Sequence, residues 1–442
     1  MNLKSSFWYA TKILNSPFGK NTTGRRSLVG AIFCIALSLV PLVVVQTVAD
    51  GMIEGITSRM VGLSSYHAAA YLVTPFSNNS TEAQIAELEN TRKTLEKQSF
   101  VQGAFVEVSG TALAAGKNGR SGAQIRAINN RLFTENSAFL KYINVVEGTT
   151  NLLNSSSAVI GKKIAQDLGV HVGDSIRLIG TMTLANGKVI PKVKIFKISG
   201  IVSSGYEELD ALWVFVPLAS GMAFLSGSSS QFKIGLEIDG AFTNNFALEI
   251  SEIKSKLSSN WSLFTWSELN SSQYENFAST RILLLFIMFL ILLISSVNIS
   301  AAIVMVVMER RSEIAILKSM GASPSGITAS FILCGTFCGL GGVVIGIPLG
   351  LLCSINVNEI LDFIQKIVNV CAKFMYLLVG KTDYIPVELL NPAYYLDSIP
   401  IHISFTELFV IAIGTICLSM IVSFLPSVHA GQEKPLSIFR KL

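Results

Sequence analysis

Residues 282–320 read ILLLFIMFLILLISSVNISAAIVMVVMERRSEIAILKSM, and this stretch decides the class of fold. Residues 282–308 carry no charged side chain, and about 20 apolar residues are enough to cross the core of a bilayer. Charges begin abruptly at Glu309 and alternate with Ile314, Leu317 and Met320, which are expected to lie on one helical stripe. The stretch therefore predicts a transmembrane helix that is followed by a short amphipathic helix at the membrane surface.

The composition of the whole chain agrees with a membrane protein. The chain has 442 residues and a net charge of +5; 50% of its residues are hydrophobic and only 14% are charged. Soluble domains carry about 25% charged residues, and the mean hydropathy is +0.53. These values exclude an ordinary soluble enzyme and a disordered protein. No stripe of Lys and Arg residues forms, so a nucleic-acid partner is not expected.

Four charge-poor segments predict an integral membrane α-helical fold with one span before a large domain and three after it. The predicted spans are residues 27–49, 281–308, 325–355 and 405–428. The first is longer than the apolar region of a signal peptide, about 7–15 residues, so an uncleaved helix is expected. Mixed composition predicts a water-exposed α+β domain at 50–280 and a loop with an amphipathic helix at 356–404.

Basic residues predict the orientation of the spans. They gather in the N-terminal segment 1–26, in the segment 309–324 between the second and third spans and in the tail 429–442. Short loops rich in Lys and Arg stay in the cytoplasm. Both termini are therefore expected to be cytoplasmic, and the large domain and the loop 356–404 extracytoplasmic.

Local signals within the large domain predict several elements. Thr81 and Gln84 have capping-box spacing at the start of a helix that extends through Gln98. A helix is expected over 162–168, ended by Gly169, and another over 243–257. Strands are expected over 104–108, 175–179, 193–202 and 212–216, with a hairpin turn at Asn186-Gly187.

Candidates for catalytic and metal sites are few. Glu207, Glu208 and Asp210 form an acidic cluster that suits an acid–base or cation site, or simply a solvated turn. Cys334 and Cys338 share a helix face, where they favour packing over a metal pair. The four histidines have no spacing typical of metal ligands. We expect no metal site, no bound cofactor and no catalytic residue in this chain.

Small residues recur in the third span. Glycines on a helix face allow close helix–helix approach, within one chain or between two. They are Gly335, Gly339, Gly342, Gly346 and Gly350. Residues 359–379 have apolar side chains at three-and-four spacing, which predicts an amphipathic helix that lies on the outer membrane surface or packs on the large domain.

Three motifs resemble the MacB/FtsX-type ABC transporter permeases. They are ERRSEIAILKSMGAS at 309–323, AVIG at 158–161 with GVHVGD at 169–174, and the closing pattern from Pro426 and Ala430 through Pro435 to Arg440. A fourth, NPAYYLDSIP at 391–400, resembles a segment of the lipoprotein-releasing permeases LolC, LolE and LolF. The resemblance covers nearly the whole chain.

The resemblance implies a permease subunit, not an enzyme, in the bacterial inner membrane. Such a permease lifts lipoproteins from the outer leaflet towards a LolA-like periplasmic chaperone, which LolC captures with a hook; Leu225–Gln231 lies roughly where a hook is expected. No Walker A sequence occurs, so ATP and Mg²⁺ are expected on two separate ATPase subunits. The residues expected to contact them are Glu309, Arg310, Arg311, Glu313, Ile314, Leu317, Gly321 and Ala322.

Flexible apolar side chains at the outer ends of the first two spans suit a lipoprotein's acyl chains, although lipid contact or core packing would use them equally. They are Val44, Val48, Met52, Leu284, Leu285 and Met288. Two other functions stay open: an efflux permease of the MacB kind, and an FtsX-like signalling protein that controls a cell-wall hydrolase. The sequence also leaves open whether the chain pairs with a second copy of itself or with a paralogue.

Overall fold

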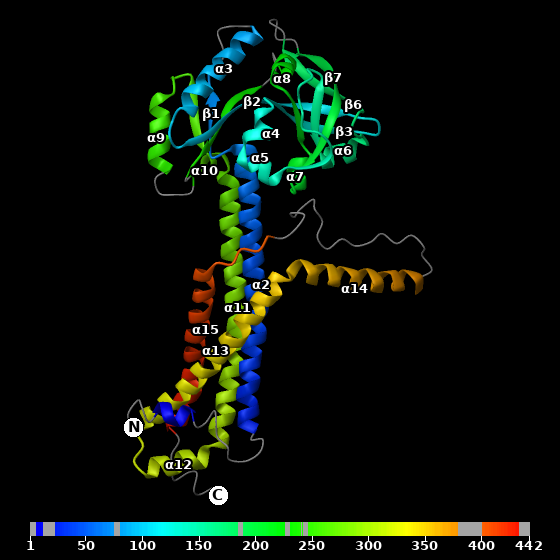
Figure 1. Ribbon diagram of the computed structural model, residues 1–442. Helices are drawn as coiled ribbons and strands as arrows, with labels where there is room; N and C mark the ends of the chain where they lie inside the picture. Colours follow the sequence, from blue (N-terminus) through cyan, green and yellow to red (C-terminus); the bar gives the residue numbers. More distant parts are fainter. Residues whose placement is uncertain are drawn as a thin grey trace. The chain divides into compact units, whose positions relative to one another are not determined.

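The structure, a computed structural model, describes residues 6–11, 23–74, 80–183, 189–225, 230–239, 241, 246–378 and 400–432. The described chain forms two compact units (Figure 1). One is the continuous segment Met52–Asn276, which contains the described strands. The other consists of the described residues before Met52 and after Asn276, and it contains most of the length of the apolar helices.

The Met52–Asn276 unit is a mixed α/β domain built on one sheet, which has ten strands among the described residues. The strands are β1 (Ala68–Leu72), β2 (Val101–Ala115), β3 (Arg120–Ile128), β4 (Asn144–Gly148), β5 (Ser157–Gly161), β6 (Ser175–Thr183), β7 (Val189–Ser203), β8 (Trp213–Pro217), β9 (Gln231–Ile238) and β10 (Trp261–Thr265). Their order is β10-β1-β9-β2-β3-β8-β5-β7-β4. Strand β6 pairs with both β2 and β7, so β2, β3, β8, β5, β7 and β6 close into a ring.

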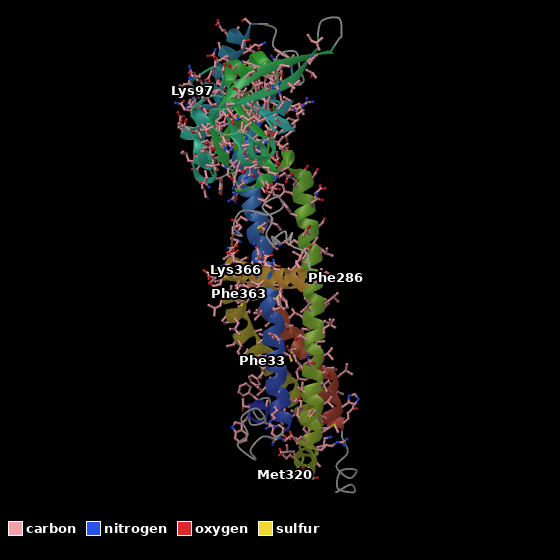
Figure 2. All side chains as sticks on the ribbon, turned by 90° about the vertical axis from the view of Figure 1, so that its right-hand side faces the viewer. Phe33, Lys97, Phe286, Met320, Phe363 and Lys366 are labelled. Atoms are coloured by element: carbon pink, nitrogen blue, oxygen red, sulfur yellow. The ribbon has the colours of Figure 1, made fainter. Side chains whose placement is uncertain are left out.

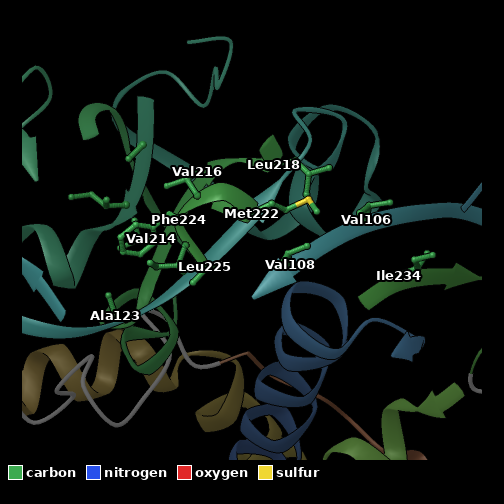
Figure 3. Close-up of a cluster of buried hydrophobic side chains, with 14 of the residues drawn as sticks. Val106, Val108, Ala123, Val214, Val216, Leu218, Met222, Phe224, Leu225 and Ile234 are labelled. Carbon is green, nitrogen blue, oxygen red and sulfur yellow. The ribbon is translucent and has the colours of Figure 1, made fainter. Parts of the chain in front are cut away.

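Short helices cover this sheet. They are the π-helical turn η1 (Val61–Ser65), α3 (Thr81–Glu96), α4 (Arg131–Glu135), α5 (Ser137–Tyr142), α6 (Lys162–Leu168), α7 (Glu207–Asp210), α8 (Leu218–Leu225), α9 (Phe246–Lys256) and α10 (Trp266–Leu269). Figure 3 shows α8 placing its apolar side chains among those of the strands. The side chains in this contact include Leu218, Met222, Phe224 and Leu225 of α8 and Val106, Val108, Ala123, Val214 and Val216 of the strands.

Most local predictions within the domain are confirmed. Helix α6 has the predicted bounds, because Gly169 adopts the left-handed conformation (φ +62°) that ends it. Helix α3 begins at Thr81, but its cap is Ser80, whose hydroxyl accepts a hydrogen bond from the Ala83 amide, so Thr81 is not the capping residue. The predicted strands are present and several are longer. The Asn186-Gly187 turn lies outside the described residues.

The second unit contains long apolar helices. Among the described residues four are long and apolar enough to cross a membrane: α2 (Thr23–Met60), α11 (Ser271–Glu309), α13 (Pro324–Ile355) and α15 (Phe405–Gln432). Helices α2 and α11 extend beyond the predicted spans 27–49 and 281–308. Charges such as Asp50, Glu54 and Arg59 end the apolar segment of α2 without ending the helix, because Glu and Arg favour helical backbone.

Glycines allow α13 to approach two neighbours closely. A Cβ on Gly335 would collide with the Ser423 hydroxyl of α15, and one on Gly339 would lie 2.7 Å from Ser419 Cβ. On the α2 side, Cβ atoms on Gly342, Gly346 and Gly350 would lie 2.5 Å from Ile35 Cγ2, 2.8 Å from Leu39 Cβ and 2.7 Å from Val43 Cβ. The glycine series predicted from the sequence therefore lies at helix–helix contacts within one chain.

Helix α15 presents a ladder of hydroxyls to this contact. Thr415, Ser419, Ser423 and Ser427 are all buried. The hydroxyls of Ser419 and Ser427 donate to the carbonyls of Thr415 (2.7 Å) and Ser423 (2.6 Å), and Ser423 donates likewise to Ser419. Each hydroxyl is thus satisfied within its own helix.

Two further helices connect the spans. Helix α12 (Arg311–Ser319) joins α11 to α13, and α14 (Val357–Leu378) follows α13 directly after Asn356. The segment 391–399, which carries most of the resemblance to the lipoprotein-releasing permeases, and the tail after Gln432 lie outside the described residues.

Candidate functional site

The α12 elbow is held to the span helices by apolar burial and by one polar contact. Ile314 and Ala315 are fully buried, and Ile314 belongs to a cluster with Val307 of α11 and Ile327 of α13. Lys318 donates from Nζ to the Gly431 carbonyl near the end of α15 (2.6 Å). The elbow is therefore fixed to three of the long helices rather than hanging from a flexible loop.

Charged residues of the elbow face outward. Arg310 donates from Nη1 to both carboxylate oxygens of Glu313, at 2.8 and 2.9 Å. Glu309, Arg311 and Glu313 are exposed. Arg310 is half-buried and Glu313 is 49% exposed, and an ion pair with a solvent-exposed partner contributes little to folding stability.

The predicted apolar stripe of the elbow, Ile314, Leu317 and Met320, is wrong. Ile314 is buried, whereas 80% of the Met320 side chain is exposed (Figure 2). Residues spaced by three drift by about 60° per step around a helix, and α12 already ends at Ser319. The exposed apolar residues are instead Ile316, which is not in the predicted stripe, and Met320, which was expected on the same face as the buried Ile314.

The remaining elbow candidates shape the turn. Gly321 has φ +91° and leaves open space around its Cα, which lets the chain reverse between α12 and α13. Ser323 caps α13 by accepting a hydrogen bond from the Gly326 amide (3.2 Å). Leu317 and Ala322 are half-buried beside this turn.

The six residues predicted to contact acyl chains differ in exposure. Val44, Val48, Met52 and Leu284 are half-buried, and Leu285 is 48% exposed. Met288 is only 5% exposed, because it packs with Leu42, Val43 and Leu408. Met288 therefore belongs to the packing between α2, α11 and α15, and it offers no surface to a ligand from outside the chain.

Much of α2 and α11 is apolar and uncovered. On α2 an exposed stripe recurs at every fourth residue, and on α11 exposed apolar residues extend over most of the span; Figure 2 labels Phe33 and Phe286 as examples. The stripe of α2 includes Val29, Phe33, Leu37 and Val45. Surfaces of this size require lipid or a second membrane chain.

The acidic cluster of the domain is structural. Asp210 is buried and accepts hydrogen bonds from the Ser203 hydroxyl (2.7 Å), the Ser204 amide (2.8 Å) and the Ser204 hydroxyl (2.7 Å). Glu207 pairs with Lys163 at 2.8 Å. Gly161, the last residue of the AVIG motif, packs against Asp210. A Cβ on Gly161 would collide with the Asp210 carbonyl, so this position requires glycine. Within the described residues, no group of three or more His, Cys, Asp or Glu side chains could hold a metal ion.

Comparison with known proteins shows the family to which the chain belongs. Residues 28–249 match the MacB-like periplasmic core domain, and residues 285–435 match the C-terminal domain of FtsX-like permeases. The chain belongs to the MacB/FtsX-type permease family. It is a membrane protein with a periplasmic domain.

Several lipoprotein-releasing permeases are similar to this chain over nearly its whole length. LolC of the lipoprotein-releasing system of Neisseria meningitidis serogroup B is 24% identical, with 92% of each chain covered. LolC of Xylella fastidiosa strain Temecula1 is 23% identical, with 93% of this chain and 92% of that chain covered. LolE of Haemophilus influenzae is 23% identical, with 91% and 92% covered.

Sequence reasoning missed a polar cluster where the apolar segments of the permease end. Gln46 donates from Nε2 to Asp50 Oδ2 and to Glu407 Oε2, both at 2.8 Å. Arg281 pairs with Glu407 and lies 3.6 Å from Asp50. The cluster links α2, α11 and α15. The available signal was a charged residue at one end of the first, second and fourth predicted spans: Asp50, Arg281 and Glu407.

Sequence reasoning also missed a buried ionic cluster in the domain. Arg126 Nη2 lies 2.6 Å from Glu107 Oε2, and Lys233 Nζ lies 3.1 Å from Glu107 Oε1. Burial raises the pKa of Glu107, but the charges of Arg126 and Lys233 outweigh that effect and lower the pKa to about 2. Arg126 also donates to the Leu63 carbonyl (2.7 Å) and Lys233 to the Ser64 carbonyl (3.1 Å).

Tyr66, two residues after the second of those carbonyls, has a strained backbone. Tyr66 has φ +60°, which is unfavourable for a side chain with a Cβ, and its hydroxyl donates to Glu107 (2.8 Å). A Cβ on Gly235 would collide with its ring, so the glycine makes room for it. The ionic cluster thus fixes the turn η1, through which the chain leaves α2 and enters the sheet.

Proposed function

We propose that this chain is the transmembrane permease subunit of an ABC transporter that extracts lipoproteins from the outer leaflet of the inner membrane towards a periplasmic chaperone. The observation that carries the proposal is the similarity to LolC and LolE over more than nine-tenths of this chain. The apolar surfaces of α2 and α11 support it, since a triacylated anchor gains about 0.8 kcal/mol per buried CH₂ and needs a comparable surface on the permease.

The proposal includes partners and an orientation. Two ATPase subunits bind at the elbow on the cytoplasmic face, where both termini lie, and they carry the ATP and Mg²⁺. A second permease, either a copy of this chain or a paralogue, completes the transporter. A LolA-like chaperone receives the cargo in the periplasm; four residues of the segment considered for a hook, 226–229, lie outside the described part of the chain.

Photo-crosslinking tests the cargo. A crosslinking amino acid at Val48, Leu284 or Leu285 is expected to capture mature lipoproteins in whole cells, because these side chains lie near the outer ends of the apolar segments. The matched control is Met308, which is 63% exposed at the opposite end of α11. Capture is expected to fall when ATP is supplied to the purified transporter. Equal capture at Met308, or equal capture of a cargo whose lipidated cysteine is replaced, would contradict lipoprotein extraction.

The elbow is tested by charge reversal. Glu313→Lys places two positive charges side by side, and it is expected to cost about 2–5 kcal/mol in ATPase binding if Glu313 contacts the partner. The measurement is ATPase copurification together with ATP-driven release of a lipoprotein. The control is the swap Arg310→Glu with Glu313→Arg, which keeps the internal pair. If the swap restores both activities, Glu313 acts only within the chain and the partner contact is wrong.

A further inference from the structure

Helix α14 has two sharply different faces. At 100° per residue, Ile360, Ile364, Ile367, Cys371 and Phe374 fall on one side of the helix. Phe363 and Val370 flank this apolar face with 64% and 68% of their side chains exposed. The opposite side carries a polar stripe of Asp362, Lys366, Asn369 and Lys373. Figure 2 labels Phe363, at the edge of the apolar face, and Lys366, in the polar stripe.

The start of α14 lies where the apolar surface of the bundle ends. The Thr47 hydroxyl of α2 donates to Ser354 Oγ of α13 at 2.8 Å, and α14 begins three residues later. Three residues beyond Thr47, Asp50 opens the charged cluster with Arg281 and Glu407. In a membrane-spanning bundle, this change from apolar to charged side chains marks the boundary between hydrocarbon and water.

Helix α14 then points away from the span helices instead of running parallel to them (Figure 1). Figure 1 shows α14 leaving the end of α13 and extending away from α13 and α15. Its 22 residues span about 33 Å. A helix that starts at the hydrocarbon boundary and runs across the direction of the spans follows the surface of the membrane.

Lipid is the occupant that these observations favour. The apolar face continues the exposed apolar surface at the end of α13, where Leu349, Leu352 and Ile355 are 45%, 58% and 55% exposed. The exposed apolar side chains of the spans require lipid acyl chains up to the point where α14 begins. The apolar face of α14 can therefore contact the same lipid monolayer, and no protein partner is needed to cover it. Two acidic and two basic residues, Glu359, Asp362, Lys366 and Lys373, balance the charge of the helix, so apolar burial rather than charge would hold it there.

We propose that α14 lies flat in the monolayer at the outer ends of the spans, with Cys371 at the centre of the face that enters the acyl chains and the Asp362–Lys373 stripe in the headgroup region. The proposal needs only a membrane-spanning bundle, so it stands apart from the identity of the cargo. Helices of this kind enter the boundary between headgroups and acyl chains by about 5–10 Å.

A spin label on Cys371 tests the proposal in the full-length protein. The other five cysteines are replaced by serine or alanine, and the protein is reconstituted into vesicles of phosphatidylethanolamine and phosphatidylglycerol. Oxygen, which partitions into lipid, is expected to relax the label at Cys371 several-fold more strongly than a water-soluble nickel chelate does. The matched control moves the label by two residues, with Cys371→Ser and Lys373→Cys, and the preference is expected to reverse. Vesicles of phosphatidylcholine alone are expected to give the same result, since charge does not hold the helix.

Three results would overturn the proposal. Water-like relaxation at both positions would place α14 in solvent, and shielding from both reagents at Cys371 would mean that protein, either a second copy or the periplasmic domain, covers the face. A second variant, Phe363→Asp with Val370→Asp, is expected to shift the Cys371 label to water-like relaxation. In that variant a separately retained Cys338, fully buried in the bundle, should stay unreactive, which shows that the bundle is intact. An unchanged label would contradict insertion.

Discussion

The interior of the Met52–Asn276 unit holds charged side chains, whereas the interior of the helical unit holds glycines and hydroxyls. In the domain, Glu107, Arg126 and Lys233 are all buried and paired with one another. Between the spans, Gly335 and Gly339 face Ser423 and Ser419. Water drives apolar burial in the domain, and that gain offsets the cost of burying ions. Lipid supplies no such force, so the spans associate through close contact between small residues.

The largest effect expected from this comparison follows from breaking the ionic cluster. Arg126→Met removes one of the two cations paired with Glu107 and the donor to the Leu63 carbonyl, which should cost about 3–5 kcal/mol of unfolding free energy. The readout is tryptophan fluorescence during denaturant unfolding of the full chain, because Trp213 lies under the guanidinium at 4.8 Å. Arg177→Met, on the exposed side of β6, is the control and should change little. Equal decreases in unfolding free energy for the two variants would show that the ionic cluster does not contribute more to stability than an exposed arginine does.

Acid should weaken the same cluster by a smaller amount. The pKa of Glu107 is lowered from 4.5 to about 2 in the folded state, so its stabilising contribution is complete above pH 4.5 and is lost as pH falls towards 2. The difference in unfolding free energy between the wild type and Glu107→Gln, measured by the same fluorescence, should therefore shrink over this range. A difference that stays constant from pH 6 to pH 3 would show that folding does not lower the pKa of Glu107.

The helical unit should respond to volume instead of charge. Gly342→Ala places a methyl group 2.5 Å from Ile35 Cγ2, which should cost about 1–3 kcal/mol. Gly414→Ala meets nothing within 4 Å and should be neutral or stabilising by up to about 1 kcal/mol, because alanine favours the helix. With Cys338 as the only cysteine retained, its maleimide reactivity during a titration with sodium dodecyl sulfate reports the opening of α13. Equal midpoints for the two variants would contradict close packing at Gly342.

The features that could be predicted from the sequence are those that depend on residues close together in the chain. The bounds of α6, the elbow after the second span and the amphipathic character of α14 depend on residues within a few turns of one another, so the chain shows them directly. The ionic cluster could not be predicted, because Tyr66, Glu107, Arg126 and Lys233 meet only through the pairing of β2 with β3 and β9. Each of those residues on its own is typical of a solvated strand end.

The candidate site shows the same limit. The elbow and the glycine series were found from spacing, but the burial of Met288 depends on where Leu42 and Leu408 pack. The outward position of Met320 follows from the end of α12 at Ser319, one residue earlier than a continuing stripe requires. The cluster of Gln46, Asp50, Arg281 and Glu407 joins three helices whose contributing residues are more than 120 positions apart in the chain, and no local pattern connects those helices.

The hydroxyl ladder of α15 has a consequence for how this helix can vary in evolution. Ser419 and Ser423 donate their hydroxyl hydrogens within the helix, and the close approach of Gly339 and Gly335 of α13 leaves room only for small side chains at these two positions. Selection at these positions should therefore depend on the volume of the side chain and very little on its polarity. Alanine and serine should interchange freely among descendants of this chain, whereas valine, although more apolar, should be purged. A substitution matrix based on hydrophobicity would rank those exchanges in the wrong order.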